Sequence, residues 1–158
     1  MSKIMRILIL VATCLTAGYF ASMATQSGVD TWYPTLEKPI FNPPSWVFAP
    51  VWSSIYIMMG VAGGLIWSRI EHERTAVRKA LLFFAIQLGL NMLWSVLFFT
   101  FHNMMLALVE IVLLWLMIYE TYLLFKRIDK IAGYLFIPYL IWVAFAAVLN
   151  ASIWWLNK

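Results

Sequence analysis

Polar and aromatic side chains embedded in long apolar runs are the residues of this chain best suited to bind a ligand. They recur at intervals of four, which places each set on one face of a helix. The four sets are Ala17, Ala21 and Thr25; Phe48, Trp52 and Tyr56; Gln87, Asn91 and Ser95; and Trp142, Ala146 and Asn150. Trp94 lies beside the third set. Polar groups are costly inside an apolar run, so these residues indicate helix contacts or a binding site.

Together these sets predict a cavity with aromatic walls, a few amide groups and one wall of small residues. Such a lining suits a flat, largely apolar ligand. An indole offers a stacking face and one N–H donor, and covering one face of a buried indole contributes about 2–3 kcal/mol before ordering costs. The alternative is that the stripes serve helix packing or form interfacial belts, as we expect for Trp154 and Trp155.

Other kinds of site find no support in the sequence. Cys14 is the only cysteine, His72 lies among charged residues and His102 at an expected turn, so we predict no metal site. No hydrolase motif and no glycine-rich phosphate loop is present. Glu120 can reach a charged end of its apolar run, whereas Glu110 is better placed for a buried polar contact or, alternatively, a proton relay. We therefore expect no metal, no obligatory cofactor and no hydrolytic catalysis.

The elements that position these side chains are predicted to be membrane-spanning helices. The chain has 158 residues, 64% hydrophobic and 11% charged, with a mean hydropathy of +0.86. Five apolar runs occupy residues 7–25, 46–67, 80–101, 104–125 and 131–156. At about 1.5 Å per residue, each spans roughly the 30 Å of a hydrocarbon core. We predict an all-α integral membrane protein, a single domain over residues 1–158 with a bundle of five transmembrane helices.

A proline-rich connector joins the first two runs. Four of the six prolines lie in residues 26–45, namely Pro34, Pro39, Pro43 and Pro44. Proline lacks an amide proton and holds the preceding residue away from helical dihedral angles. We predict that this stiff segment, with Trp32 near one end, covers the cavity as a lid and that Ser45 caps the next helix. We also expect kinks at Pro50 and Pro138.

Positive charge is distributed unevenly over the connectors. Of the eleven Lys and Arg residues, only Lys38 and Lys158 follow the first, third or fifth run; the other nine lie on the opposite side of a five-span topology. This excess predicts a cytoplasmic N-terminus, with residues 26–45 outside, in a bacterial cell membrane. The first run has an alternative interpretation, because Lys3, Arg6 and its apolar core are typical of a cleaved signal peptide. Its length favours a retained helix.

Two small-residue steps predict close helix contacts. Gly60 and Gly64 form a G-x-x-x-G step, and Ala85 and Gly89 form a similar one. Small residues let two helix backbones approach each other closely in a membrane. The contact lies either within one subunit or between two, and the sequence leaves both readings open for each step.

Three motifs resemble the translocator protein family, also called tryptophan-rich sensory proteins or peripheral-type benzodiazepine receptors. The first is W-Y-x-x-L-x-K-P-x-x-x-P-P-x-W-x-F-x-P-V-W from Trp32 to Trp52. The second is L-N-x-x-W-S over 90–95, and the third is P-Y-x-x-W-x-x-F-A-x-x-L-N over 138–150. With the five-run pattern, the resemblance covers almost the whole chain. It implies a five-helix bundle, often a homodimer, whose ligand cavity is closed by the loop between helices one and two.

The resemblance also implies a class of ligand. Relatives bind porphyrins such as protoporphyrin IX and haem, as well as isoquinoline carboxamides and benzodiazepines. Some promote light-dependent breakdown of protoporphyrin, in which pocket tryptophans are implicated. Trp52 and Trp142 match those positions and are the candidate catalytic residues. The predicted ligand-binding residues are Ala21, Trp32, Pro44, Phe48, Trp52, Gln87, Asn91, Trp94, Trp142, Ala146 and Asn150.

We predict a membrane receptor or sensor that binds a porphyrin or a similar planar hydrophobic ligand, with a role in tetrapyrrole regulation or stress response. Its expected partners are that ligand, membrane lipid and a second copy of the chain, with no nucleic acid. The alternatives are an enzyme that degrades porphyrin in light and a transporter of tetrapyrrole or sterol-like molecules. Animal relatives carry a sterol motif with a tyrosine soon after the position of Asn150, and residues 151–158 contain no tyrosine.

Overall fold

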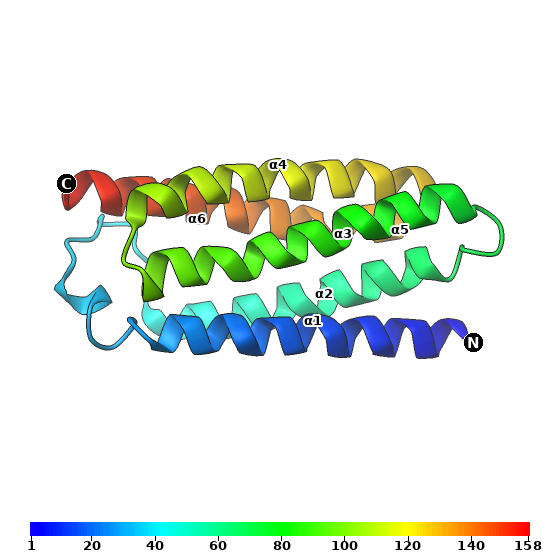
Figure 1. Ribbon diagram of the computed structural model, residues 1–158, viewed down its shortest axis with the longest axis horizontal. Coiled ribbons are helices and arrows are strands. Elements are labelled where there is room, and N and C mark those ends of the chain that lie inside the picture. The colour runs from blue at the N-terminus through cyan, green and yellow to red at the C-terminus, as the bar shows by residue number, and fades with distance from the viewer.

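The computed structural model describes residues 1–158 as a bundle of helices joined by short connectors (Figure 1). The helices are α1 (Lys3–Gln26), α2 (Phe48–Trp67), α3 (Arg74–Ser95), α4 (Met104–Ile128), α5 (Lys130–Tyr134) and α6 (Ile137–Leu156). Short 3-10 turns cover Tyr33–Thr35 and Ser45–Val47, and a π-helical segment covers Val96–Thr100. Five helical stretches are long and apolar enough to cross a membrane. The predicted all-α bundle of five membrane-spanning helices is therefore confirmed.

The observed helix boundaries differ from the predicted ones mainly at charged ends. α3 begins at Arg74, not at residue 80, because Val77 and Ala80 are fully buried while the charged residues around them point outward. α4 likewise continues past residue 125 to Ile128. A prediction from hydropathy makes a membrane helix too short when its last turn is amphipathic. The charged face lowers the mean hydropathy of that turn, although its apolar face still packs against the bundle.

The prolines act at helix starts, where their missing N–H is tolerated. Pro50 is the third residue of α2 and follows a 3-10 turn, so it lies in the first turn of that helix, and the kink expected there stays a prediction. The Ser45 side chain accepts no capping hydrogen bond, so its predicted cap is wrong. Pro138 is the second residue of α6, just after the break between α5 and α6. The fifth span is thus interrupted just before Pro138, and a kink at Pro138 itself stays a prediction.

Two glycines of α2 let it contact the backbone of α1. A Cβ atom on Gly60 would lie 2.4 Å from the Cα of Val11, and one on Gly64 would lie 2.4 Å from the Cα of Ile7. The G-x-x-x-G step therefore serves a contact within one chain. Nothing lies within 4 Å of a Cβ atom built on Gly89, so the second small-residue step faces outward.

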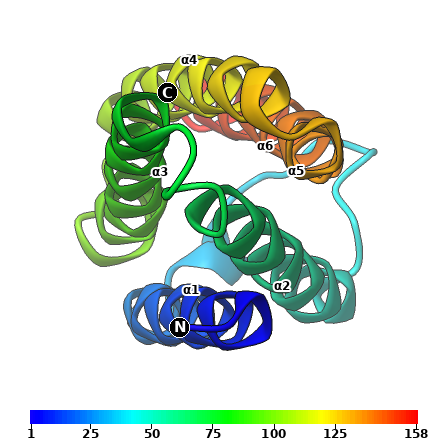
Figure 2. The ribbon, with the colours of Figure 1, turned by 90° about the vertical axis from the view of Figure 1, so that its right-hand side faces the viewer.

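The connectors divide the bundle into two chemically different ends. The N-terminus, the connector between α2 and α3 and the junction of α4 with α5 lie at one end, together with nine of the eleven basic residues (Figure 1). The loop 27–44, the turn between α3 and α4 and the C-terminus lie at the other end. Viewed from the N-terminal end, α1 and α2 lie side by side on one side of the bundle and α4 with α6 on the other, with α3 linking them (Figure 2).

Candidate functional site

A cavity of about 990 Å³ lies beneath the loop 27–44, at the end of the bundle opposite the N-terminus. Its walls come from α1, α2, the C-terminal part of α3 and α6, and its roof comes from the loop, including Pro43 and Pro44. This volume is at the upper end of the roughly 300–1,000 Å³ typical of small-molecule sites. The predicted cavity beneath a proline-rich lid is therefore present in the fold.

Aromatic side chains of α2 and α6 form one corner of this cavity. The ring centroids of Trp52 and Trp142 lie 6.4 Å apart at an interplanar angle of 84°, and those of Phe48 and Trp142 lie 6.0 Å apart at 65°. Trp52 also stacks on Tyr56, with centroids 5.8 Å apart. Edge-to-face contacts of this kind fix ring orientations. The indole Nε1 of Trp142 is buried and has no acceptor.

The face that α1 turns to the cavity includes several small side chains beside the larger Leu15, Tyr19 and Gln26. Ala21, Ser22 and Thr25 line the cavity there, and the Thr25 hydroxyl donates to the Ala21 carbonyl oxygen at 3.0 Å. Gly18 faces the Tyr56 ring so closely that a Cβ atom would lie 2.6 Å from it. Small side chains next to aromatic rings leave room for a planar molecule to stack.

Two of the predicted polar residues line the cavity but use their hydrogen-bonding groups elsewhere. The Trp94 indole Nε1 donates to Asn150 Oδ1 at 3.0 Å, and Asn150 Nδ2 donates to the Met104 carbonyl oxygen at 3.0 Å. This chain joins α3, α6 and the start of α4. The pair therefore holds one side of the cavity in shape.

Two other predicted binding residues lie beneath the cavity, in a buried network. The Tyr56 hydroxyl donates to Asn91 Oδ1 at 2.6 Å, Asn91 Nδ2 donates to the Tyr139 oxygen at 2.8 Å, and that hydroxyl donates to Gln87 Oε1 at 2.8 Å. Tyr56 lines the cavity, whereas Asn91 and Gln87 do not. The structure thus corrects their predicted position in the lining, because their amides are occupied in joining α2, α3 and α6.

Trp32 also lies outside the cavity lining and instead anchors the lid. Its ring stacks on His102 with centroids 4.3 Å apart and an interplanar angle of 7°, and it meets Phe98 edge-on at 5.5 Å. Asn157 provides a second anchor, since its side chain makes hydrogen bonds of 2.9 and 2.8 Å to the Glu37 backbone. The loop is therefore fixed to the α3–α4 turn and to the C-terminal end of α6.

The remaining eight predicted residues share the cavity: Ala21, Pro44, Phe48, Trp52, Trp94, Trp142, Ala146 and Asn150. Tyr56 also lines the cavity, as expected from its stripe with Phe48 and Trp52, although the list of predicted ligand-binding residues omits it. The prediction missed Phe98 and Phe99 in the π-helical segment, although they follow Trp94 and Ser95 at the same step of four. The loop residues of the lining carry no periodic signal at all.

The mouth of the cavity is polar. Lys38 Nζ donates to the Leu36 carbonyl oxygen at 3.1 Å and lies 4.7 Å from the centre of the Tyr33 ring. The Tyr33 hydroxyl donates to Asn42 Oδ1 at 3.1 Å. Burial raises the pKa of Tyr33, although its hydrogen bond to Asn42 acts in the opposite direction, so this side chain is a neutral phenol at physiological pH. No group of histidine, cysteine or acidic residues is arranged to hold a metal ion.

The two glutamates of α4 have different surroundings. Glu110 is buried, and neither of its carboxyl oxygens has a hydrogen-bond partner. It does not line the cavity, and it makes no hydrogen bond to the Tyr139 network. Glu120 is exposed on the surface of the bundle, in agreement with its expected position near a charged end.

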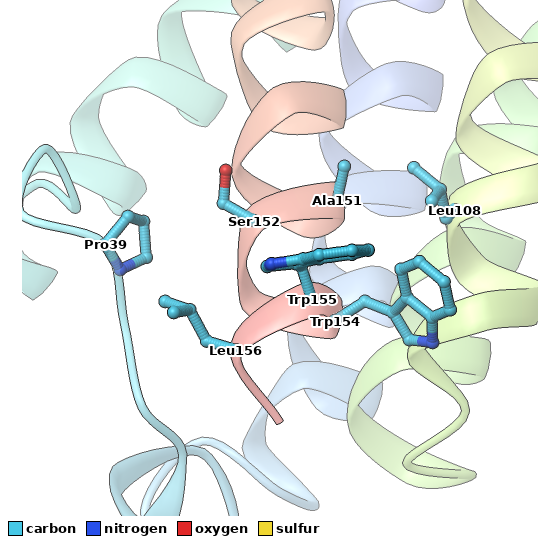
Figure 3. Close-up of a pocket in the computed structure, with 7 residues that line it drawn as sticks. All are labelled: Pro39, Leu108, Ala151, Ser152, Trp154, Trp155 and Leu156. Carbon is cyan, nitrogen blue, oxygen red and sulfur yellow. The ribbon is translucent and has the colours of Figure 1, made fainter. Parts of the chain in front are cut away.

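A second hollow, of about 550 Å³, lies on the outer surface of the bundle beside the C-terminal turn of α6 (Figure 3). Trp154 and Trp155 line it together with Leu108 of α4 and Pro39 of the loop. It is shallow and open, and 62% of the surface of Trp155 is exposed. These indoles are located where an interfacial belt is expected, so we regard the enclosed cavity as the functional site.

Comparisons with known proteins agree with this architecture. The pattern of the TspO/MBR family matches residues 10–156. "Tryptophan-rich protein TspO" of Chlorobaculum tepidum is 41% identical over 98% of both chains, and "Protein CrtK" of Rhodobacter capsulatus is 39% identical over 90% of this chain and 92% of its own. "Translocator protein" of Bos taurus is 34% identical over 89% of this chain and 83% of its own. The chain therefore belongs to the TspO/MBR family.

Proposed function

We propose that this protein is a membrane receptor or sensor that binds a porphyrin, such as protoporphyrin IX or haem, in the cavity beneath the loop 27–44. Family membership supports a sensor or translocator role. The observation that carries the porphyrin proposal is the size and chemistry of the cavity: about 990 Å³, with two indoles in contact with each other and several small side chains of α1 in the lining. A role in tetrapyrrole regulation or stress response belongs to the same proposal.

The two indoles would make different contacts with the ligand. Because Trp52 and Trp142 are nearly perpendicular, a planar ligand that stacks on one ring meets the edge of the other. Each contact covers apolar surface worth about 2–3 kcal/mol at most, before the ligand is ordered. Two such contacts are enough for micromolar binding together with the rest of the lining.

Quenching of tryptophan fluorescence tests this proposal. Protoporphyrin IX is titrated into the detergent-solubilised protein and into the double variant Trp52→Ala, Trp142→Ala. We expect the affinity to fall about a hundredfold, which is tenfold for each lost ring. The matched control is Trp154→Ala, Trp155→Ala, which removes two indoles outside the cavity and should leave the affinity unchanged. Equal affinities of the wild type and the cavity variant would overturn the proposed site.

A second candidate function is light-dependent breakdown of the bound porphyrin. The observation in its favour is the contact of Trp52 with both Trp142 and Tyr56, which places three oxidisable rings at the cavity wall. Illumination of a stoichiometric complex in the presence of dioxygen, which is the oxidant that ring opening requires, should then yield a defined open-chain product. If the same product forms at the same rate with free tryptophan or with the cavity double variant, the protein is not the catalyst.

We also propose a homodimer that uses the outward face of α3. Ala85 and Gly89 are exposed there, and nothing lies within 4 Å of a Cβ atom on Gly89. A small-residue step without a partner in its own chain is available to another helix. Gly89→Leu should shift the purified protein from dimer to monomer in light scattering. A dimer that survives both this change and Ala85→Leu uses another face.

We propose a bacterial cell membrane as the location, with the N-terminus in the cytoplasm. Nine of the eleven basic residues gather at the N-terminal end of the bundle, and this excess favours the cytoplasmic side. A cysteine placed in the connector between α2 and α3 should be protected from a membrane-impermeant thiol reagent in intact cells. A cysteine at position 37, in the loop, should react.

A further inference from the structure

The charges around the cavity are confined to its mouth. All lining residues contributed by the membrane-spanning helices are uncharged, and the loop contributes Asp30 and Lys38. Asp30 is exposed, whereas Lys38 is partly buried beneath the lid. Of the two charged groups in the lining, the more buried one is therefore a cation.

The Lys38 ammonium is held in place without being neutralised. It donates one hydrogen bond to the Leu36 carbonyl oxygen and faces the Tyr33 ring, at the distances given above. The ion pairs of the protein join Arg6 to Glu71 and Arg69 to Asp129, so no carboxylate lies within 4 Å of Lys38. Tyr33 is a neutral phenol and supplies only its ring. This arrangement fixes the position of the cation and leaves its charge unpaired.

An ammonium has three N–H donors. In Lys38 one of them is hydrogen-bonded to the Leu36 carbonyl oxygen, and the group also faces the Tyr33 ring. The N–H donors that remain free suit an anionic acceptor. Partial burial beneath the lid strengthens an ion pair relative to one on an open surface, and a cation that is already positioned loses little side-chain freedom when the anion arrives.

We propose that Lys38 binds a carboxylate of the ligand, so that the cavity selects planar apolar molecules that carry an anionic group at one edge. This inference rests on the proposed function, because protoporphyrin IX has such acidic side chains. The ring system then lies between the indole corner and the α1 wall, and the acidic edge points toward the loop. The mouth thus sets both the class of ligand and its orientation.

A comparison of protoporphyrin IX with its dimethyl ester tests this assignment, since the ester keeps the ring but removes the charge. The affinity ratio of acid to ester is measured for the wild type, Lys38→Gln and Lys38→Arg. We expect a ratio of about ten in the wild type, a ratio near one in Lys38→Gln and most of the preference in Lys38→Arg. The ratio in the wild type should also fall as salt is added.

Lys158→Gln is the matched control, because it removes a cation at the same end of the bundle but outside the cavity lining; its ratio should equal that of the wild type. Comparing variants cancels the different aggregation of the two free ligands, which is the same in every titration. If Lys38→Gln weakens acid and ester equally, or changes neither, the carboxylate contact is overturned while porphyrin binding stands. If neither ligand binds the wild type, the proposed function itself fails.

Discussion

In the half of the bundle nearer the N-terminus, Phe84, Phe125 and Phe136 interlock with ring centroids 5.0–6.3 Å apart. In the opposite half, Trp52 and Trp142 contact each other at a similar distance but border a cavity. The number of rings does not explain this difference. What differs is the side chains opposite the rings and the freedom of the rings to move inward.

The filled half closes because its helices come together. The phenylalanines project from α3, α4 and the start of α6 into one space, and Gly60 and Gly64 bring α1 against α2. In the hollow half, α1 presents small side chains to the rings. Tyr56 is tied to the buried Asn91, and the lid is anchored by Trp32 and Asn157. A cavity persists where the rings are held by their own contacts and the small side chains of α1 leave the space beside them unfilled.

Truncation of one aromatic ring in each half should have opposite consequences. Phe136→Ala should lower the free energy of unfolding by about 3–5 kcal/mol, because the ring is fully buried in a filled core. Trp142→Ala should lower it by only about 1 kcal/mol, because the ring already borders a void and carries an unpaired N–H. Thermal unfolding in detergent and porphyrin titration measure the two effects. We expect the affinity to fall about tenfold in Trp142→Ala and to stay unchanged in folded Phe136→Ala.

The comparison fails if Trp142→Ala is as unstable as Phe136→Ala, since the indole would then be a packing residue of a filled core. It also fails if Phe136→Ala weakens binding as strongly as Trp142→Ala, because the two halves would then not be separable.

Adding a single methyl group at Gly60 tests the close contact between α1 and α2 in the filled half. Gly60→Ala places a Cβ atom within 2.4 Å of the α1 backbone, so the two helices must separate, and we expect a loss of about 2–3 kcal/mol in the free energy of unfolding. Gly89→Ala is the matched control on a helix of similar length, where the new atom meets open space. It should be neutral or stabilise by up to about 1 kcal/mol through helix propensity. Equal effects in the two variants would contradict the close α1–α2 contact.

Much of the hollow half follows from sequence because its determinants are periodic. The steps of four from Phe48 to Trp52 and from Trp142 to Ala146 place these pairs on single helix faces, and the prolines mark the lid. The spacing of residues in one helix does not show how far each side chain lies from the cavity, because that depends on the neighbouring helices. A step of four shows that Asn91 shares a face with Ser95, but not that Tyr56 lies between Asn91 and the cavity.

The positions of the loop residues and of the helix ends could not be predicted from the sequence. Tyr33 and Lys38 reach the cavity mouth through the path of an irregular chain, which no spacing rule describes. Trp32 is part of a strong motif, yet its partner His102 lies 70 positions away and adopts a positive φ of 54°. The structure thus gives Trp32 a role as an anchor of the lid, and its contact with ligand stays a prediction.

The smallest expected effect concerns the ion pair that fastens the filled end. Arg6 donates to Glu71 and to the Trp67 carbonyl oxygen, and so fixes the start of α1 to the end of α2. The Arg6 hydrogen bond lowers the pKa of the Glu71 carboxyl from 4.5 to about 2. The pair therefore stabilises the fold above the ordinary carboxyl pKa, and this contribution is lost as the pH falls from about 5 toward 2. Because 59% of the Glu71 side chain is exposed, its contribution is small.

We expect Glu71→Gln to lower the melting temperature by about 2 °C at pH 7, with the difference from the wild type shrinking steadily toward pH 3. Glu37→Gln is the control at the hollow end, because its carboxylate makes no ion pair, and it should show no such pH-dependent difference. Porphyrin affinity at pH 7 should be the same in both variants and the wild type, since neither side chain lines the cavity. A melting difference that grows on acidification would reverse the sign of this linkage and detach Arg6 from Glu71 in solution.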